Sequence, residues 1–184
     1  MDKQRNFYKN TFHHIYNRGA FQNNIFYKNA DYEYFMRKLD EYKTKYKIEI
    51  LCFCLMPNHY HLFTKQTTNE YLTSNFIADL SNSFTKGMNK KYNRSGVLFE
   101  GKTKSKHINN EAYHKLIIKY ILYNPVQAKL VRNFFDYEYS SAKEILGLKT
   151  SPITSINELL DYFDSIKSFK EFILDEKQKV IYEF

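Results

Sequence analysis

The chain has 184 residues, of which 43% are hydrophobic, and carries a formal net charge of +8 at pH 7. This length suits one domain with a sizeable core, and only five Gly and three Pro argue against an intrinsically disordered chain. No apolar run approaches the ~20 residues that span a bilayer, and MDKQRNFYKN at the N-terminus lacks the apolar core of a secretory signal, so we expect a cytoplasmic protein without a membrane span.

Charge is distributed unevenly along the sequence. Residues 81–110 carry seven Lys and Arg against one acidic residue, whereas residues 151–184 carry four Lys against seven acidic residues. A basic body with a mildly acidic tail favours a polyanionic partner, most simply a nucleic acid. A solvated, Lys-rich surface explains the same charge equally well, so charge alone does not decide between the two.

The first two predicted elements are a strand and a helix. TFHHIYN (11–17) is typical of a strand. A helix over 30–46 follows, with Asn29 or Asp31 as its cap. This helix is indicated by aromatic and apolar residues on one stripe, namely Tyr32, Phe35, Leu39, Tyr42 and Tyr46.

The next stretch predicts a hairpin. The continuous apolar run IEILCFCL (48–55) predicts a central strand. Its two cysteines, Cys52 and Cys54, point to the same face, so we expect buried thiols in a reducing cytoplasm rather than a disulfide. MPN is a turn signal, and HYHLFT (59–64) forms the return strand.

Two helices and one strand complete the predicted domain. The first helix spans roughly 69–92, with apolar residues at four-residue steps: Leu72, Phe76, Leu80, Phe84 and Met88. KTKSKHI (102–108) predicts extended structure, after a short VLF segment. EAYHKLIIKYILYN (111–124) predicts a last helix that ends at Pro125.

The predicted domain boundary lies near GLKTSPITS (147–155). We therefore expect one domain over 1–148 and a small helical C-terminal extension over 149–184. The extension has apolar residues at helical spacing, namely Leu159, Tyr162, Phe163 and Ile166.

The order strand, helix, strand, strand, helix, strand predicts an α+β fold with a ferredoxin-like split βαβ antiparallel sheet. In this arrangement the first and third strands are central, so the strand over 59–64 lies in the middle of the sheet. Two crossover helices cover one face. The other face is left for the last helix, over 111–124.

One constellation of side chains points to chemistry. On a strand, His59 and His61 turn to one face and Tyr60 to the other. Tyr120 and Asn124 are four residues apart and share one face of the last helix. If the two faces meet, two imidazoles and an amide oxygen form a partial shell that favours Mg²⁺ or Mn²⁺ over structural zinc. A phenol beside such a cation can act as a nucleophile once it is deprotonated.

Two motifs carry a family resemblance. They are MPNHYHLF (56–63) and YILYNPVQAKLV (120–131), with HIYNRG (14–19) and GVLFEGKTKS (96–105) similar in order and spacing. In these segments the chain resembles the HUH-type single-tyrosine transposases of single-stranded DNA, and most closely their REP-associated group. The resemblance covers roughly residues 11–145, and the motifs occur together and in order.

The resemblance implies a function for each matching residue. His59, His61 and Asn124 take the positions of metal ligands, and Tyr120 takes that of the nucleophile. It implies cleavage and rejoining of single-stranded DNA, expected in hairpins or inverted repeats, through a 5′-phosphotyrosine with Mg²⁺ or Mn²⁺. Such a protein is nucleoid-associated when bound to DNA, and it can act as a monomer or a homodimer.

Basic residues are candidate DNA contacts. The resemblance suggests Arg18, after the first strand. Lys102, Lys104 and Lys106 alternate along one strand face, which suits either a phosphate track or a solvated strand edge. Arg94 lies with several lysines at the end of the long helix, where these cations favour the helix dipole as well as any phosphate.

Other interpretations stay open. His59 and His61 are alternatively core histidines, and Tyr123 competes with Tyr120 although it lies off the Asn124 face. Structural or surface roles are expected for the other histidines, His13, His14, His107 and His114. A non-catalytic binding module for single-stranded DNA or RNA on the same fold is the second functional class. A replication or mobilisation initiator is the third, although initiators usually carry larger additional domains.

Overall fold

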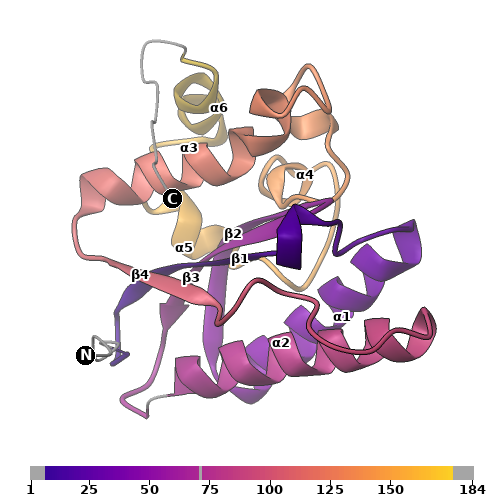
Figure 1. Cartoon of the computed structure of the whole chain (residues 1–184). Coiled ribbons are helices and arrows are strands. Elements are labelled where there is room, and N and C mark those ends of the chain that lie inside the picture. The colour runs from indigo at the N-terminus through magenta and orange to yellow at the C-terminus, as the bar shows by residue number, and fades with distance from the viewer. Residues whose placement is uncertain (1–6, 71, 176–184) are drawn as a thin grey trace.

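The computed structural model describes residues 7–70 and 72–175 (Figure 1). Within them, one antiparallel sheet has the order β2-β3-β1-β4, made of β1 (Phe12–Arg18), β2 (Ile48–Met56), β3 (His59–Gln66) and β4 (Lys104–Ile108). Helix α1 (Asn29–Lys45) connects β1 to β2, and α2 (Leu72–Lys91) connects β3 to β4. The predicted α+β, ferredoxin-like order is confirmed, with β1 and β3 in the middle of the sheet.

The sheet separates two layers of helices (Figure 1). Helices α1 and α2 cover one face, and α3 (Glu111–Gln127) crosses the other. The remaining short elements are η1 (Ala20–Gln22) after β1, and η2 (Phe134–Asp136), α4 (Ala142–Ile145), α5 (Ile156–Leu160) and α6 (Ile166–Leu174) after α3. Two apolar cores result, one on each face of the sheet. Among the helices of the described residues, none has the length and apolarity to cross a membrane.

The prediction that residues 48–55 form a central strand is wrong, because β2 lies at the edge of the sheet. It is nevertheless buried along almost its whole length. Chain from the C-terminal part covers its outer edge: Leu55 N–H donates to Tyr139 O, and Ser155 N–H donates to Ile50 O. A covered edge needs apolar residues on both faces, as a central strand does. Cys52 and Cys54 are fully buried here, as predicted.

Helix α3 continues through Pro125 to Gln127, so the prediction that it ends at residue 124 is also wrong. Proline removes one N–H from the helix, but the turn that follows satisfies the last carbonyls. Lys129, at φ 57°, donates its N–H to Val126 O at 2.9 Å, and Leu130 N–H donates to Pro125 O at 2.9 Å. These two bonds form a Schellman motif with a lysine in the usual glycine position. Asn124 is thereby held in regular helix.

The C-terminal part is helical, as predicted, and it forms two short helices with a turn between them. Helix α5 ends at Leu160, and Ser165 starts α6 by accepting the Ser168 N–H at 3.1 Å. Leu159 and Phe169 are buried in the same core as α3. The proposed division between 1–148 and 149–184 stays a prediction, and the two parts share this core.

The other predicted boundaries lie within one to three residues of the observed ones. The start of α1 differs in its cap: Lys28 is the N-cap residue, and neither Asn29 nor Asp31 takes that position. Asp31 nevertheless serves the helix start, because its Oδ2 accepts the N–H groups of Tyr27 at 2.8 Å and Lys28 at 2.9 Å. Its Oδ1 accepts a hydrogen bond from Lys91 Nζ at 2.6 Å. One buried carboxylate therefore joins the start of α1 to the end of α2.

We expect Asp31→Ala to lower the free energy of unfolding by about 2–3 kcal/mol at pH 7, because it leaves buried N–H groups without an acceptor. Burial disfavours the charged form, but hydrogen bonds from Lys91, Tyr92 and the Tyr27 and Lys28 amides outweigh it and keep the Asp31 pKa below its ordinary value. The stabilisation is therefore complete above pH ~4 and is lost as pH falls through the folded-state pKa.

Urea unfolding of both proteins between pH 7 and pH 3 measures this effect, and the difference between them should shrink in acid. Asp40→Ala is the matched control, since Asp40 is a partly exposed carboxylate 3.8 Å from Lys43 on the same helix. An exposed pair of this kind contributes less than ~1 kcal/mol. Equal losses in the two variants would contradict the role of Asp31.

Candidate active site

His59 and His61 occupy the middle of the sheet on the face that α3 crosses. Tyr60, between them, points to the other face and is buried in the core beneath α1 and α2. On the neighbouring strand, Tyr16 pairs with His61 and Arg18 pairs with His59. Directly opposed residues of antiparallel strands stand on the same face. Strand β1 therefore supplies the immediate neighbours of the histidine pair.

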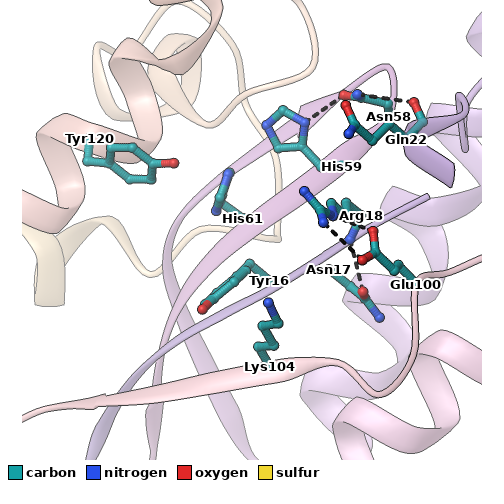
Figure 2. Close-up of a pocket in the computed structure, with 10 residues that line it drawn as sticks. All are labelled: Tyr16, Asn17, Arg18, Gln22, Asn58, His59, His61, Glu100, Lys104 and Tyr120. Atoms are coloured by element: carbon teal, nitrogen blue, oxygen red, sulfur yellow. Dashed lines mark hydrogen bonds and ion pairs between the residues drawn. The ribbon is translucent and has the colours of Figure 1, made fainter. Parts of the chain in front are cut away.

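Helix α3 brings Tyr120 and Asn124 to these histidines. The Asn124 Oδ1 lies 3.2 Å from His59 Nε2, and the Tyr120 ring lies 5.2 Å from the His61 ring at an interplanar angle of 83°. Both α3 side chains are buried. Figure 2 shows Tyr120 extending from α3 with its hydroxyl directed toward the histidine pair. All four side chains predicted to converge do so.

A cavity of about 240 Å³ opens beside this cluster. Its lining comes from β1, β3, β4, α3 and the loops at one end of the sheet (Figure 2): Tyr16, Asn17, Arg18, Gln22, Asn58, His59, His61, Glu100, Lys104 and Tyr120. Most of these side chains are polar or charged. The cavity therefore suits a polar ligand that reaches Tyr120 and both histidines at once.

His14, for which a structural or surface role was expected, contacts the site directly. Its Nε2 lies 2.9 Å from His61 Nδ1, and the two rings stack at 5.1 Å. Burial and then the charge of Lys106 lower the His14 pKa to about 3. Burial, followed by His14 and His59, also holds the His61 pKa well below its ordinary value. Both rings are neutral at pH 7, so one donates a hydrogen bond to the other.

The hydrogen-bond network also assigns the tautomer of His59. Asn58 Nδ2 donates to Gln22 O, so Asn58 Oδ1 is the acceptor for His59 Nδ1, 2.7 Å away. Burial lowers the His59 pKa, which favours the neutral ring. The Nε2 of that neutral ring is an acceptor, and it faces the Asn124 oxygen.

Two facing acceptors 3.2 Å apart fit a shared cation. Neighbouring ligands of an octahedral ion with ~2.1 Å bonds are ~3.0 Å apart. If His61 Nδ1 donates its proton to His14, the His61 Nε2 is left as an acceptor that could serve as a third ligand. Within residues 7–70 and 72–175, no group of three His, Cys, Asp or Glu side chains could hold a metal ion. A site here must therefore use the amide oxygen of Asn124, and the residues present fit a divalent ion.

Comparison with known proteins decides the family. The sequence profile of the IS200-like transposases matches residues 7–124, well over half of the chain. The chain belongs to the IS200-like transposase family. The match includes all four converging side chains, and it ends at Asn124.

A solved structure of a transposase has the same fold. A REP-associated tyrosine transposase bound to a REP hairpin superposes with a TM-score of 0.67 at 18% identity, over 82% of this chain and 89% of that chain. A presumed transposase from Deinococcus radiodurans R1 gives a TM-score of 0.46 at 14% identity, over 64% of this chain and 93% of that one. No curated protein matches the chain. The first likeness establishes the transposase fold.

The predicted DNA contacts of this IS200-like transposase lie at different distances from the histidine pair. Arg18 and Lys104 line the cavity. In the β1–β4 register, Lys106 opposes His14, so Lys104 and Lys106 stand on the face that carries the histidines. Lys102 is exposed just before β4. Arg94 lies elsewhere, after α2, where its Nη1 donates to the Tyr27 hydroxyl at 3.0 Å.

Arg18 does not face the cavity alone. Its guanidinium forms a two-pronged ion pair with Glu100, in which Nη2 lies 2.9 Å from Oε1 (Figure 2). Both side chains are about half exposed. Glu100 follows Arg18 by 82 positions, so the sequence alone did not indicate this pairing. A phosphate that binds Arg18 must share or replace this carboxylate.

Two other tyrosines, Tyr16 and Tyr123, are candidates for the role proposed for Tyr120, and they lie in different positions. Tyr16 also lines the cavity and stacks on His14 at 4.8 Å, and burial raises its pKa. Tyr123, the competing candidate on α3, packs partly buried against the core on that face of the sheet. Tyr16 is therefore the stronger structural rival to Tyr120, and no motif or spacing in the sequence marks it.

Proposed function

We propose that this IS200-like transposase cleaves and rejoins single-stranded DNA through a 5′-phosphotyrosine on Tyr120. The observation that carries the proposal is the meeting of Tyr120 with His59, His61 and Asn124 beside one polar cavity. A hydroxyl nucleophile and a set of metal-binding groups, all within reach of one ligand, are what phosphodiester transfer by a tyrosine requires.

His59, His61 and Asn124 would hold a divalent cation, Mg²⁺ or Mn²⁺. When bound, such a cation polarises the scissile phosphate and neutralises developing charge. The three protein ligands are neutral, so the site keeps the full positive charge of the ion for the phosphate oxygens of DNA. His14 fixes the orientation of His61 through their 2.9 Å hydrogen bond.

The chemical step uses the Tyr120 Oη as nucleophile. It loses its proton and forms a bond to the scissile phosphorus, while the bond from phosphorus to the 3′ oxygen breaks and that oxygen takes up a proton. The products are a 5′-phosphotyrosine and a free 3′-hydroxyl. The new link is also a phosphodiester, so attack by a 3′-hydroxyl reverses the step and joins strands without ATP.

The proposed substrate is a DNA hairpin or inverted repeat with unpaired DNA beside it. The protein of similar fold is bound to a REP hairpin, and Lys104 and Lys106 share the face of the histidine pair. Lys102 and Arg18 extend this basic surface. Tyr120 approaches histidines of its own chain, which supports cleavage within one protomer. Action on nucleoid DNA in the cytoplasm is proposed from the family resemblance alone, which is compatible with either a monomer or a homodimer.

A labelled hairpin oligonucleotide with single-stranded flanks, incubated with the protein and Mn²⁺, tests the proposal. We expect a protein–DNA adduct that survives denaturing electrophoresis, together with a cleaved product. Chelation by EDTA should suppress both, and a fully duplex oligonucleotide of the same sequence should give neither. Binding without any adduct would instead favour a non-catalytic nucleic-acid-binding protein on this fold.

A further inference from the structure

The chain makes an unusual turn directly after β1. Asn23 N–H donates to Ala20 O at 3.1 Å, and the two residues between them, Phe21 and Gln22, have φ values of 57° and 60°. Positive φ at both central positions defines a type I′ turn, in which Asn, Asp and Gly predominate. Bulky L-residues such as Phe are strained there. The sequence therefore departs from the residues that would make this turn most stable.

The surrounding structure holds the turn in place. Gly19 N–H donates to Asn58 O at 2.7 Å, and Ala20 N–H donates to Leu98 O at 3.0 Å. A Cβ at Gly19 would lie 2.0 Å from Asn23 O, so only glycine permits this close return of the chain. The turn is thus fixed against the loop that precedes His59. Strain that is retained under such constraint is characteristic of ligand-binding sites.

The strain at Phe21 is not offset by burial of its side chain in the core. Its exposed fraction is 90%, the highest among the large hydrophobic side chains of the described residues. The next residue, Gln22, lines the catalytic cavity beside Asn58 and His59 (Figure 2). Arg18, at the end of β1, lines it as well. An aromatic ring is therefore held in solvent, directly adjacent in sequence to a residue that lines the cavity.

We propose that Phe21 is a stacking platform for one unpaired base next to the cleavage site. The proposal deepens the proposed function and rests on it. An exposed ring beside cationic groups is the arrangement by which proteins bind single strands, with the base on the ring and the phosphates on Lys or Arg. Lys104 supplies such a cation in the cavity lining, and Arg18 supplies another once a phosphate shares or replaces its Glu100 partner.

The test uses Phe21→Asn, which places a favoured residue in the turn and removes the ring. The melting temperature should rise by about 2–4 °C, because the turn strain falls. The affinity for a fluorescein-labelled DNA hairpin with an unpaired flank should fall by about 10-fold or more. Phe21→Tyr should retain the affinity. Leu148→Asn, at an exposed apolar residue outside the cavity lining, should leave it unchanged.

A series of hairpins, each with one abasic position in the flank, locates the base. All binding is measured by anisotropy in the Tyr120→Phe background, which prevents cleavage. We expect one abasic position that lowers the DNA affinity of the parent protein, Tyr120→Phe, about 10-fold. The same abasic position should not change the DNA affinity of the protein that also carries Phe21→Asn. If wild-type protein forms the adduct but no position distinguishes the two, the stacking role is wrong and the proposed function stands. Loss of stability in Phe21→Asn with unchanged affinity would show a structural role, and failure of the parent to bind hairpin DNA would overturn both proposals.

Discussion

Tyr120→Phe is expected to lower formation of the covalent protein–DNA adduct by roughly 10³-fold or more, because it removes the proposed nucleophilic oxygen and keeps the ring. The ring of Tyr120 is buried and packs edge-on against His61, and phenylalanine keeps that ring. The melting temperature and hairpin affinity should therefore change little. Adduct yield on denaturing gels, with affinity measured separately, distinguishes loss of chemistry from loss of binding.

Two matched variants make this experiment specific. Tyr16→Phe removes the other phenol that lines the cavity, and Tyr123→Phe removes the nearest phenol on the same helix. Both should retain adduct formation within about 10-fold of wild type. The Tyr16 hydroxyl is not directed at the histidine pair as that of Tyr120 is (Figure 2), and Tyr123 packs partly buried against the core. An adduct that persists in Tyr120→Phe and disappears in Tyr16→Phe would show that Tyr16, and not Tyr120, is the nucleophile.

The fold was largely predictable because periodicity in the sequence reports which faces are buried. The stripe Phe76–Met88 of α2 is buried as expected. Periodicity does not report what covers a strand edge, so the apolar run of β2 indicated a central strand when it is an edge covered by residues 139–141. The end of α3 was missed for a related reason. Pro125 lowers the helix propensity locally and so predicted an end at residue 124. The helix instead ends at Gln127, where the Schellman motif with Lys129 supplies hydrogen-bond donors to the last carbonyl groups.

Some residues of the candidate site were likewise predictable from the sequence, and others were not. His59 with His61, and Tyr120 with Asn124, were found because each pair has short spacing on one element. His14 and Glu100 were missed because their partners lie 47 and 82 positions away. Alternation places His14, Tyr16 and Arg18 on one face of β1, but only the antiparallel register with β3 shows which face it is. The whole sheet determines the cross-strand register, so no local sequence motif predicts it.

His59→Ala is expected to weaken Mn²⁺ binding by on the order of 100-fold and to lower adduct formation by a similar factor. His59 Nε2 faces the Asn124 oxygen at 3.2 Å, so its loss leaves that amide without its neighbouring ligand. His59 is the better test than His61, because His61 is buried and its removal would also leave a cavity and deprive His14 of its partner. Electron paramagnetic resonance of free Mn²⁺, titrated in the presence of uncleavable hairpin DNA, reports the affinity directly.

The control for this variant is His107→Ala. His107 lies on β4, and its ring stacks on that of His13 at 5.2 Å. The substitution therefore removes an imidazole and leaves the proposed metal ligands unchanged. Its Mn²⁺ affinity and adduct yield should match wild type. Excess Mn²⁺ should partly restore adduct formation in His59→Ala, since the phosphate of bound DNA still offers oxygen ligands to a weakly held ion. A His59→Ala protein with unchanged Mn²⁺ affinity would remove His59 from the ligand set, and the close approach of its ring to Asn124 would then be only a packing contact.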